Sequence, residues 1–453
     1  MYNAGLARGH DHHSTSRPAM SNTVSEALNA LRALENPAEM RRLAALGYRP
    51  EEPPKVNAHI HLPPNFSAFE SLGQAVDQAK REDIGVLGVS NYYDYEVYGD
   101  FAARARDAEI FPLFGLEVIC RDTELVSKNF KVNDPGNPGK IYLCGKGITG
   151  FDTMTAEARR LLEVIRRNDS ERMTVMVDTI EQVLGARGLS TSIDAEDVKE
   201  RIFQRHKCPR ETIHLQERHA AQAFQEAIFD AVAPEERLGR LRDLLDARSS
   251  ANSPDDHVAI QNDLRTHIMK SGRPAFVEET FVSFDEARSL ILELGGIPTY
   301  PTLADGAHLI CPFEDPPEQL IENLRSRDVH AVEFIPVRNA PEVLGDYVRA
   351  LREAGFPVTA GTEHNTLDLI PLEPTCVSGT AIPADLREIF WEGACVIAAH
   401  QYLTLHGECG FVDSGGLPNP SHPSADERIR DFAAVGAAVI RRYSEKVTRE
   451  HAA

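Results

Sequence analysis

Short apolar runs alternate along most of the chain with longer segments in which apolar residues recur at helical spacing. This alternation is typical of parallel β/α units, because a strand covered on both faces is apolar throughout and a covering helix has one apolar face. The pattern therefore predicts an α/β fold with a largely parallel sheet. It places strands at 55–60, 85–90, 110–119, 296–300, 331–335 and 357–361, and helices at 69–82, 98–107, 279–294, 317–327 and 342–354.

A charged segment divides the β/α units into two blocks. It spans 153–274, and its apolar spacing predicts several helices. We interpret this segment as a helical insertion or subdomain within one barrel, because the same rhythm of strands and helices resumes after it. The predicted organisation is a disordered leader at 1–21, N-terminal helices at 22–52, a barrel formed by 53–152 and 275–400, and a C-terminal loop and helix at 401–453.

The composition narrows the class of partner and the compartment. The chain has 453 residues, with 69 acidic and 48 basic side chains, and a formal net charge of −21. Nucleic acids and anionic membranes reward clustered cations, so neither is expected as the main partner. No apolar run reaches the ~20 residues that span a bilayer, the N-terminus lacks a signal-peptide core, and the seven cysteines form no C-x-x-C pair. We expect a cytoplasmic protein with a small-molecule substrate, in an oligomeric state that the sequence leaves open.

The first predicted strand ends in His59-Ile60-His61. Side chains alternate between the two faces of a strand, so both imidazoles lie on one side. Two imidazoles that converge on one face suit a divalent metal ion. The pattern alone also fits two ordinary surface or core histidines. A second cluster, His10-Asp11-His12-His13, lies in the predicted leader, where a flexible tail is expected.

Other polar residues follow the predicted strands at the ends where parallel β/α folds gather reactive groups. The second strand leads into Asn91-Tyr92, the third contains Glu117, and the last leads into Glu363-His364-Asn365. Glu333 lies within an apolar strand, where an isolated carboxylate is costly to bury. We therefore expect Glu333 to have either a functional partner or a structural ion pair with a nearby arginine.

The order of these motifs resembles the polymerase and histidinol phosphatase superfamily, whose members open with H-x-H, carry a G-[I/L]-E element and close with G-S-D-x-H. The likeness covers about residues 55–150 and 275–370. It implies a distorted (β/α) barrel of this type, interrupted here by the helical insertion, in a family that holds up to three metals. The matching segments are His59-Ile60-His61, Gly115-Leu116-Glu117 and Gly361-Thr362-Glu363-His364-Asn365.

The same resemblance implies one metal in this chain rather than three. Lys140 and Tyr300 stand where the second metal has its own histidines, and Tyr92 and Asn365 stand where the third has its histidines. Two histidines with two carboxylates suit a single divalent metal ion, which by ligand type is Zn, Mn, Fe or Ni. The positions of the first metal's ligands all keep metal-competent groups, namely His59, His61, Glu117 and Glu363.

Three residues at the replaced positions are candidate catalytic groups: Lys140, Tyr92 and Tyr300. Lys140 would hold an anionic substrate group, or act as a base if the metal lowers its pKa. It would instead turn to solvent if the glycine- and proline-rich loop before it is loose. Tyr92 would contact the substrate or simply cover the mouth of the barrel.

Four residues are candidate substrate-binding groups: Asn91, Arg338, His364 and Asn365. Arg338 closely follows a predicted strand and would bind a carboxylate or phosphate, or lie solvated in its loop. His364 competes with Glu363 for the metal, because a closing strand can turn either side chain inward.

The leading interpretation is a metal-dependent enzyme, by default a hydrolase, that acts on a small anionic metabolite with one divalent metal as Lewis acid or water activator. Phosphoester cleavage is the best-known chemistry of the resembling family. In-line phosphoryl displacement gains from ions on both the attacking and leaving oxygens, which a single metal does not supply. Two alternatives stay open: a single-metal isomerase or lyase of a sugar or sugar acid, and a non-catalytic, metal-bound binding module.

Overall fold

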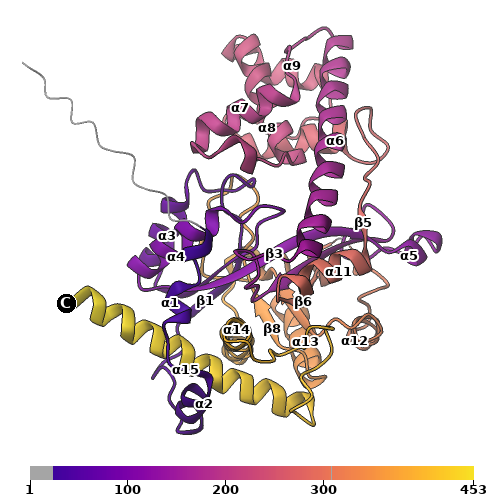
Figure 1. Ribbon diagram of the computed structural model, residues 1–453. Coiled ribbons are helices and arrows are strands. Elements are labelled where there is room, and N and C mark those ends of the chain that lie inside the picture. Colours follow the sequence, from indigo (N-terminus) through magenta and orange to yellow (C-terminus); the bar gives the residue numbers. More distant parts are fainter. Residues whose placement is uncertain (1–23, 308, 453) are drawn as a thin grey trace, which may run out of the picture.

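Seven strands form the wall of a nearly closed, distorted α/β barrel, in the order β1-β2-β3-β4-β6-β7-β8 (Figure 1). The computed structural model describes residues 24–307 and 309–452, so the leader predicted at 1–21 lies outside the described residues. The barrel predicted from the sequence is confirmed. The strands are β1 (Lys55–Ile60), β2 (Ile84–Val89), β3 (Phe111–Arg121), β4 (Lys140–Lys146), β6 (Ile297–Thr302), β7 (Ala331–Phe334) and β8 (Val358–Ala360), and the short β5 (Val282–Ser283) pairs with β3.

The strand pairing is parallel except at β4. Strands β1 to β3 are parallel to one another, as are β6 to β8, whereas β4 is antiparallel to both β3 and β6. The connection from β3 to β4 contains only the short helix α5 (Thr123–Ser127). A parallel crossover usually contains a full helix packed on the sheet, whereas this connection has one short helix and β4 returns antiparallel.

The barrel closes where the last strand meets the first. The amide of His61 donates to the carbonyl of Glu363, and the amide of Glu363 donates to the carbonyl of His59, both at 2.9 Å. Ile60 and Glu363 form a parallel bridge. The end of β8 is therefore fixed beside the two histidines of β1.

Helices cover the outside of the barrel, and their apolar faces follow from the spacing seen in the sequence. In α3 (Leu72–Arg81), Ser71 caps the first turn by accepting from the Gln74 amide, and the apolar positions are buried against the sheet. The other covering helices on the N- and C-terminal sides are α4 (Val97–Asp107), α11 (Phe284–Glu293), α12 (Pro317–Arg325) and α13 (Pro341–Glu353).

The segment between β4 and β5 folds into helices with an apolar core of their own. These helices gather on one side of the barrel, and the long C-terminal helix α15 (Ala425–Ala452) runs along the opposite side (Figure 1). The insertion touches the barrel through Arg166, whose Nε donates to the Tyr93 carbonyl at 2.6 Å. Its helices are α6 (Ala156–Ala186), α7 (Ala195–His206), α8 (Glu217–Ala231), α9 (Arg237–Leu244) and α10 (His257–Leu264), followed by a π-helical turn at Arg265–Met269.

Within the described part of the chain, none of the helices combines the length and the apolar character that crossing a membrane requires.

Helix α15 packs closely on α14 (Ala384–Leu405) at Gly436, and this contact leads to a test of packing. A Cβ at Gly436 would lie 1.8 Å from the Cys395 carbonyl oxygen, so Gly436→Ala must push the two helices apart. We expect a loss of about 1–3 kcal/mol in the free energy of unfolding, measured by urea denaturation. Gly185→Ala in α6 is the control, because a Cβ there meets nothing within 4 Å and should stabilise by about 0.5–1 kcal/mol. Equal stability of the Gly436 variant and the native protein would contradict a tight helix contact.

Candidate metal centre

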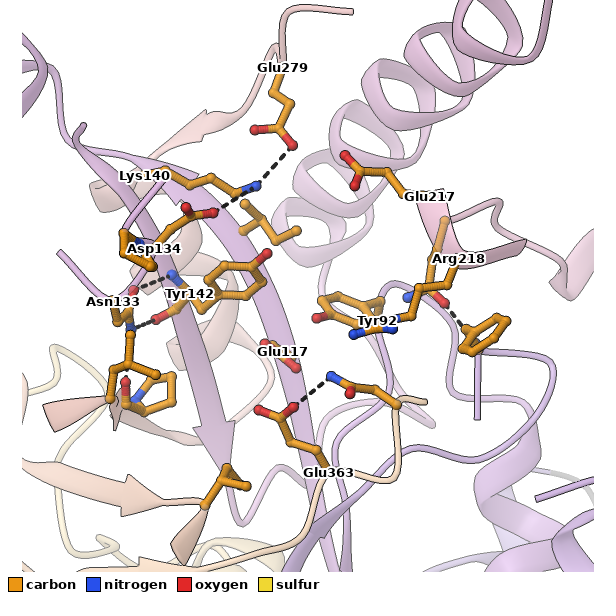
Figure 2. Close-up of a pocket in the computed structure, with 18 of the residues that line it drawn as sticks. Tyr92, Glu117, Asn133, Asp134, Lys140, Tyr142, Glu217, Arg218, Glu279 and Glu363 are labelled. Carbon is orange, nitrogen blue, oxygen red and sulfur yellow. Dashed lines mark hydrogen bonds and ion pairs between the residues drawn. The ribbon is translucent and has the colours of Figure 1, made fainter. Parts of the chain in front are cut away.

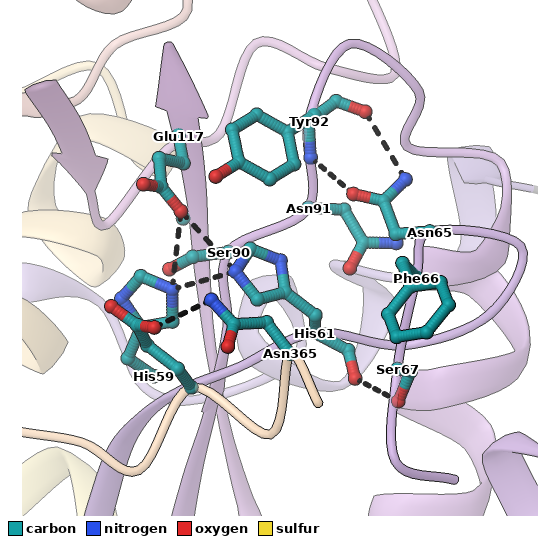
Figure 3. A network of polar contacts seen from close by, with 12 residues as sticks. His59, His61, Asn65, Phe66, Ser67, Ser90, Asn91, Tyr92, Glu117 and Asn365 are labelled. Atoms are coloured by element: carbon teal, nitrogen blue, oxygen red, sulfur yellow. Dashed lines mark hydrogen bonds and ion pairs between the residues drawn. The ribbon is translucent and has the colours of Figure 1, made fainter. Parts of the chain in front are cut away.

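Three buried side chains converge at the floor of the barrel mouth: His59 and His61 at the end of β1, and Glu117 in β3 (Figure 3). The Nε2 atoms of the two histidines are 3.3 Å apart, and Glu117 Oε2 lies 3.2 Å from His61 Nε2 and 3.6 Å from His59 Nε2. Ligands bound tetrahedrally at about 2.0–2.1 Å from zinc are about 3.4 Å apart. The three donor atoms therefore have the separations that one tetrahedral metal ion needs.

The electrostatics of these residues also fit a cation. Burial lowers the pKa of His61, which the nearby Glu117 carboxylate only partly offsets, so this ring is neutral at neutral pH. Glu117 Oε2 is buried and makes no hydrogen bond of acceptable geometry with any described residue. A buried carboxylate oxygen without a partner is costly. A divalent ion bound by this oxygen and by the two Nε2 atoms would supply the partner that Glu117 Oε2 lacks.

Glu333 and Lys146 hold His59 in the form that a metal ligand requires. His59 Nδ1 donates to Glu333 Oε2 at 2.6 Å, which leaves the Nε2 lone pair directed at the cluster. Lys146 Nζ lies 2.7 Å from Glu333 Oε1 and donates to Ala58 O and Ser90 Oγ, both at 3.0 Å. Burial alone would raise the pKa of Glu333, but Lys146 and His59 outweigh it and lower the pKa. A carboxylate behind a histidine is the usual support of a metal-binding imidazole.

Lys146 is the site residue that sequence reasoning missed. Glu333 had been expected to pair with an arginine or a functional partner, and it pairs with His59 and with this lysine. Lys140, Cys144 and Lys146 lie on one face of β4 because side chains alternate along a strand. The sequence feature that points to Lys146 is a charged residue within an otherwise apolar strand, and Glu333 has the same feature.

Cys144 approaches His59 and Glu333 closely enough to suggest a second group of ligands. Burial, and then the neighbouring carboxylates, raise the pKa of the Cys144 thiol well above its usual value, so it is not a thiolate. Glu333 is already bound by Lys146. The cluster of His59, His61 and Glu117 is therefore the better candidate metal centre.

Glu363, expected as the fourth ligand, faces the same cavity but is engaged by other side chains (Figure 2). Arg338 Nη1 donates to its Oε1 at 3.0 Å, and Asn365 Nδ2 donates to its Oε2 at 2.6 Å. Burial alone would raise the pKa of Glu363, but the Arg338 guanidinium outweighs it and holds the pKa at about 2. Its role as a ligand stays a prediction, and it would require an exchange of these contacts.

Two predicted substrate-binding residues lie away from the cavity. His364 Nε2 donates to the Ile370 carbonyl at 2.9 Å, its Nδ1 accepts from Thr362 Oγ1 at 2.8 Å, and its ring stacks on Phe69. Asn91 uses its side-chain amide to bridge the main-chain N–H and C=O of Leu62. Arg338 and Asn365 line the cavity, whereas His364 and Asn91 are not among its lining residues.

Tyr300 lies on the opposite face of the sheet from Glu333. In the pairing of β6 with β7, Glu333 is opposite Pro301, whereas Tyr300 is opposite Val332, and alternate residues point to alternate faces. The Tyr300 hydroxyl donates to Glu314 Oε1 at 2.8 Å. The structure therefore does not bring this predicted catalytic residue to the histidines.

Lys140 lies at the start of β4, four residues along the strand from Cys144 and opposite Arg121. Its Nζ is 2.9 Å from Glu279 Oε1 and 3.2 Å from Asp134 Oδ2. Burial alone would lower the pKa of Lys140, but Tyr142 and these two carboxylates outweigh it and raise the pKa. Lys140 lines the upper part of the cavity as a paired cation (Figure 2).

The cavity above the histidines has a volume of about 400 Å³ and is shared between the barrel and the insertion. The barrel provides Tyr92, Glu117 and Glu363, and the insertion provides Glu217 and Arg218 (Figure 2). The ring of Tyr92 stacks on the ring of His61, with centroids 5.1 Å apart and planes 3° from parallel. Tyr92 therefore forms the part of the cavity wall that lies against His61.

The sequence matches no family model and no curated protein. Among solved structures, the chain is similar to that of an amidohydrolase from Chromobacterium violaceum with bound sulfate and no metal, with a TM-score of 0.45 and 16% identity over 71% of this chain and 93% of that one. It is also similar to a protein from Bifidobacterium adolescentis described as a metal-dependent phosphoesterase, with a TM-score of 0.48 and 15% identity over 74% and 94%.

Proposed function

We propose that this protein is a metal-dependent hydrolase that binds one divalent metal ion through His59, His61 and Glu117 and acts on a small anionic substrate. The observation that carries the proposal is the convergence of three buried donor atoms on one point, where Glu117 Oε2 has no other partner among the described residues. These atoms lie beneath a cavity of about 400 Å³. The ion would polarise a substrate oxygen and activate a water molecule there.

The surrounding side chains have separate parts in this proposal. Glu333 fixes the proton of His59 on Nδ1, and Tyr92 fixes the plane of His61 by stacking. Glu363 is a poor base near neutral pH, because its pKa is about 2. Burial raises the pKa of Asp169, which also lines the cavity, to about 7.

The isomerase or lyase alternative depends on Lys140 as a base, and the geometry does not favour that role. A base must lose its proton near the working pH, whereas Glu279 and Asp134 keep the Lys140 ammonium charged. Hydrolysis needs no such group, since water bound to the metal provides the nucleophile. We therefore retain hydrolysis as the proposed reaction.

The first test is the metal content of the purified protein. Elemental analysis should find about one transition metal ion per chain, because both groups of possible ligands among the described residues include His59, and Glu333 is already bound by Lys146. A variant with His10, His12 and His13 replaced controls for binding by the N-terminal histidines, and it should keep the same metal content. Two or three ions per chain would contradict the single site.

The second test is turnover by the protein loaded in turn with Zn, Mn, Fe and Ni. Phosphate monoesters and amides carrying a second anionic group are suitable substrates, and release of phosphate or of an amine is the readout. We expect hydrolysis with at least one metal and none in its absence. A protein that binds one metal ion and hydrolyses none of these substrates would support the binding-module alternative.

A further inference from the structure

The cavity above the candidate metal centre is rich in charge, and nearly all of that charge is internally paired. Glu217, in the first turn of α8, forms ion pairs with three cationic side chains: Arg172 Nη2 at 2.6 Å, Lys270 Nζ at 2.7 Å and Arg265 Nη2 at 3.6 Å. Two further cations pair with carboxylates in the contacts given above. The six cationic side chains that line the cavity are Lys140, Arg172, Arg218, Arg265, Lys270 and Arg338.

Arg218 is the exception. Among residues 24–307 and 309–452, none forms a hydrogen bond or an ion pair with its guanidinium. The side chain reaches into the cavity beside Tyr92, on the insertion side of Glu117 (Figure 2). Burial, and then the nearby Arg265, lower the pKa of Arg218 to about 10, so the side chain stays charged at neutral pH. The side chain is partly buried, and a partly buried cation without a carboxylate beside it is incompletely solvated.

The position of Arg218 is fixed relative to the metal centre. Gln216, which precedes α8, accepts through its side-chain oxygen from the Phe66 amide at 2.7 Å. Phe66 lies five residues after His61, in the loop that follows β1. Gln216 and His219 also form a reciprocal cap at the start of α8. The turn that carries Arg218 is thus tied to the loop that follows the metal-binding histidines.

The cavity therefore has two charges that no neighbouring side chain of opposite charge neutralises within the described chain, the Glu117 carboxylate and the Arg218 guanidinium. They form no ion pair with each other, and the Tyr92 side chain lies between them in Figure 2. Glu117 calls for a cation, which the metal supplies. Arg218 would be neutralised by an anion, and a ligand bound in the cavity could supply that anion.

We propose that Arg218, contributed by the helical insertion, binds a carboxylate or phosphate group of the substrate while the group to be cleaved lies at His59, His61 and Glu117. This inference rests on the proposed function for the second half of that statement. The substrate class is then a small molecule with an anionic group at one end and a hydrolysable bond at the other. Arg338 is less suited to this part, since Glu363 already occupies its guanidinium. The insertion acts as a specificity element for the barrel.

Calorimetric titration of inorganic phosphate and of malonate tests this assignment. Each anion is added to the metal-free and to the metal-loaded protein, and to the Arg218→Met and Arg218→Lys variants. We expect at least one of the two anions to bind the metal-free protein. Arg218→Met should reduce the affinity for that anion about 10- to 100-fold, and Arg218→Lys should reduce it less. The anion that binds more tightly identifies the group, phosphate or carboxylate. Arg242→Met, at an exposed position of the insertion, should leave binding unchanged.

Two results would overturn the inference. One is that each anion binds the Arg218→Met variant with the same affinity as the native protein, when the two proteins have the same metal content and thermal stability. The other is binding that appears only with metal present and is insensitive to Arg218. The proposed function fails separately, through absence of metal binding or of any hydrolysis by native protein. If hydrolysis is found, Arg218→Met should raise KM with little change in kcat, because the contact is made in the bound substrate and the transition state alike.

Discussion

Replacing Glu117 with glutamine should remove the metal and abolish hydrolysis. Glu117 is the only anionic member of the three converging donors, and its Oε2 atom has no other partner among the described residues. A neutral amide takes away the charge that holds the ion between two neutral imidazoles. Loss of a Lewis acid worth several kcal/mol corresponds to a decrease in kcat/KM of about a thousandfold or more.

The measurements are elemental analysis and steady-state kinetics on the same preparation. Glu163→Gln is the matched control, because Glu163 is an exposed carboxylate on α6 of the insertion, and it should keep both metal and activity. The Glu117→Gln protein should fold normally, since the amide fills the same volume. A variant that keeps a full equivalent of metal and native turnover would show that the metal lies elsewhere.

Replacing Glu333 with glutamine should weaken both the fold and the metal site. Glu333 is fully buried and is the only carboxylate in contact with the Lys146 ammonium within the described chain. Removing one partner of a buried pair leaves the other charge uncompensated, at a cost of about 3–5 kcal/mol in the free energy of unfolding. The same change removes the acceptor that sets the proton of His59, and loss of such a support lowers metal affinity about 10- to 100-fold.

Urea unfolding of metal-free protein separates the first effect from the second, which metal titration measures. The double variant Glu333→Gln, Lys146→Met completes a thermodynamic cycle, because it removes both charges at once. We expect it to recover part of the lost stability while metal affinity stays low. If Glu333→Gln alone is as stable as the native protein, the ion pair with Glu333 does not stabilise the buried Lys146 ammonium, and Lys146 must have another partner.

The barrel could be predicted from the sequence because its strands are buried on both faces. The segments 85–90 and 331–335 are largely apolar, and the structure places β2 and β7 there within one residue. The direction of β4 could not be predicted in the same way. The connection before β4, residues 122–139, is long enough for either direction, and it is a loop with one short helix in place of a full crossover helix.

The metal cluster could be expected from the sequence to the extent that it lies at strand ends. His59, His61 and Glu117 follow the alternation of β1 and the position of a glutamate in β3. Lys146 could not be assigned, because its contact with Glu333 depends on the register of an antiparallel strand. Arg218 could not be found either, since it lies in an inserted helix whose position over the barrel is set by tertiary contacts such as that of Gln216 with Phe66.

The order of the strands along the chain also has a consequence for how the molecule is made. The carboxylate that sets the proton of His59 belongs to Glu333, which follows Glu117 by 216 residues, and the closing contact at Glu363 comes later still. At a translation rate of about 5–20 residues per second, this interval lasts about 10–40 s. A nascent chain on the ribosome therefore carries all three ligands well before it carries the residue that orients one of them. For the proposed metal centre, tight capture of the ion would therefore wait until the second half of the barrel has emerged.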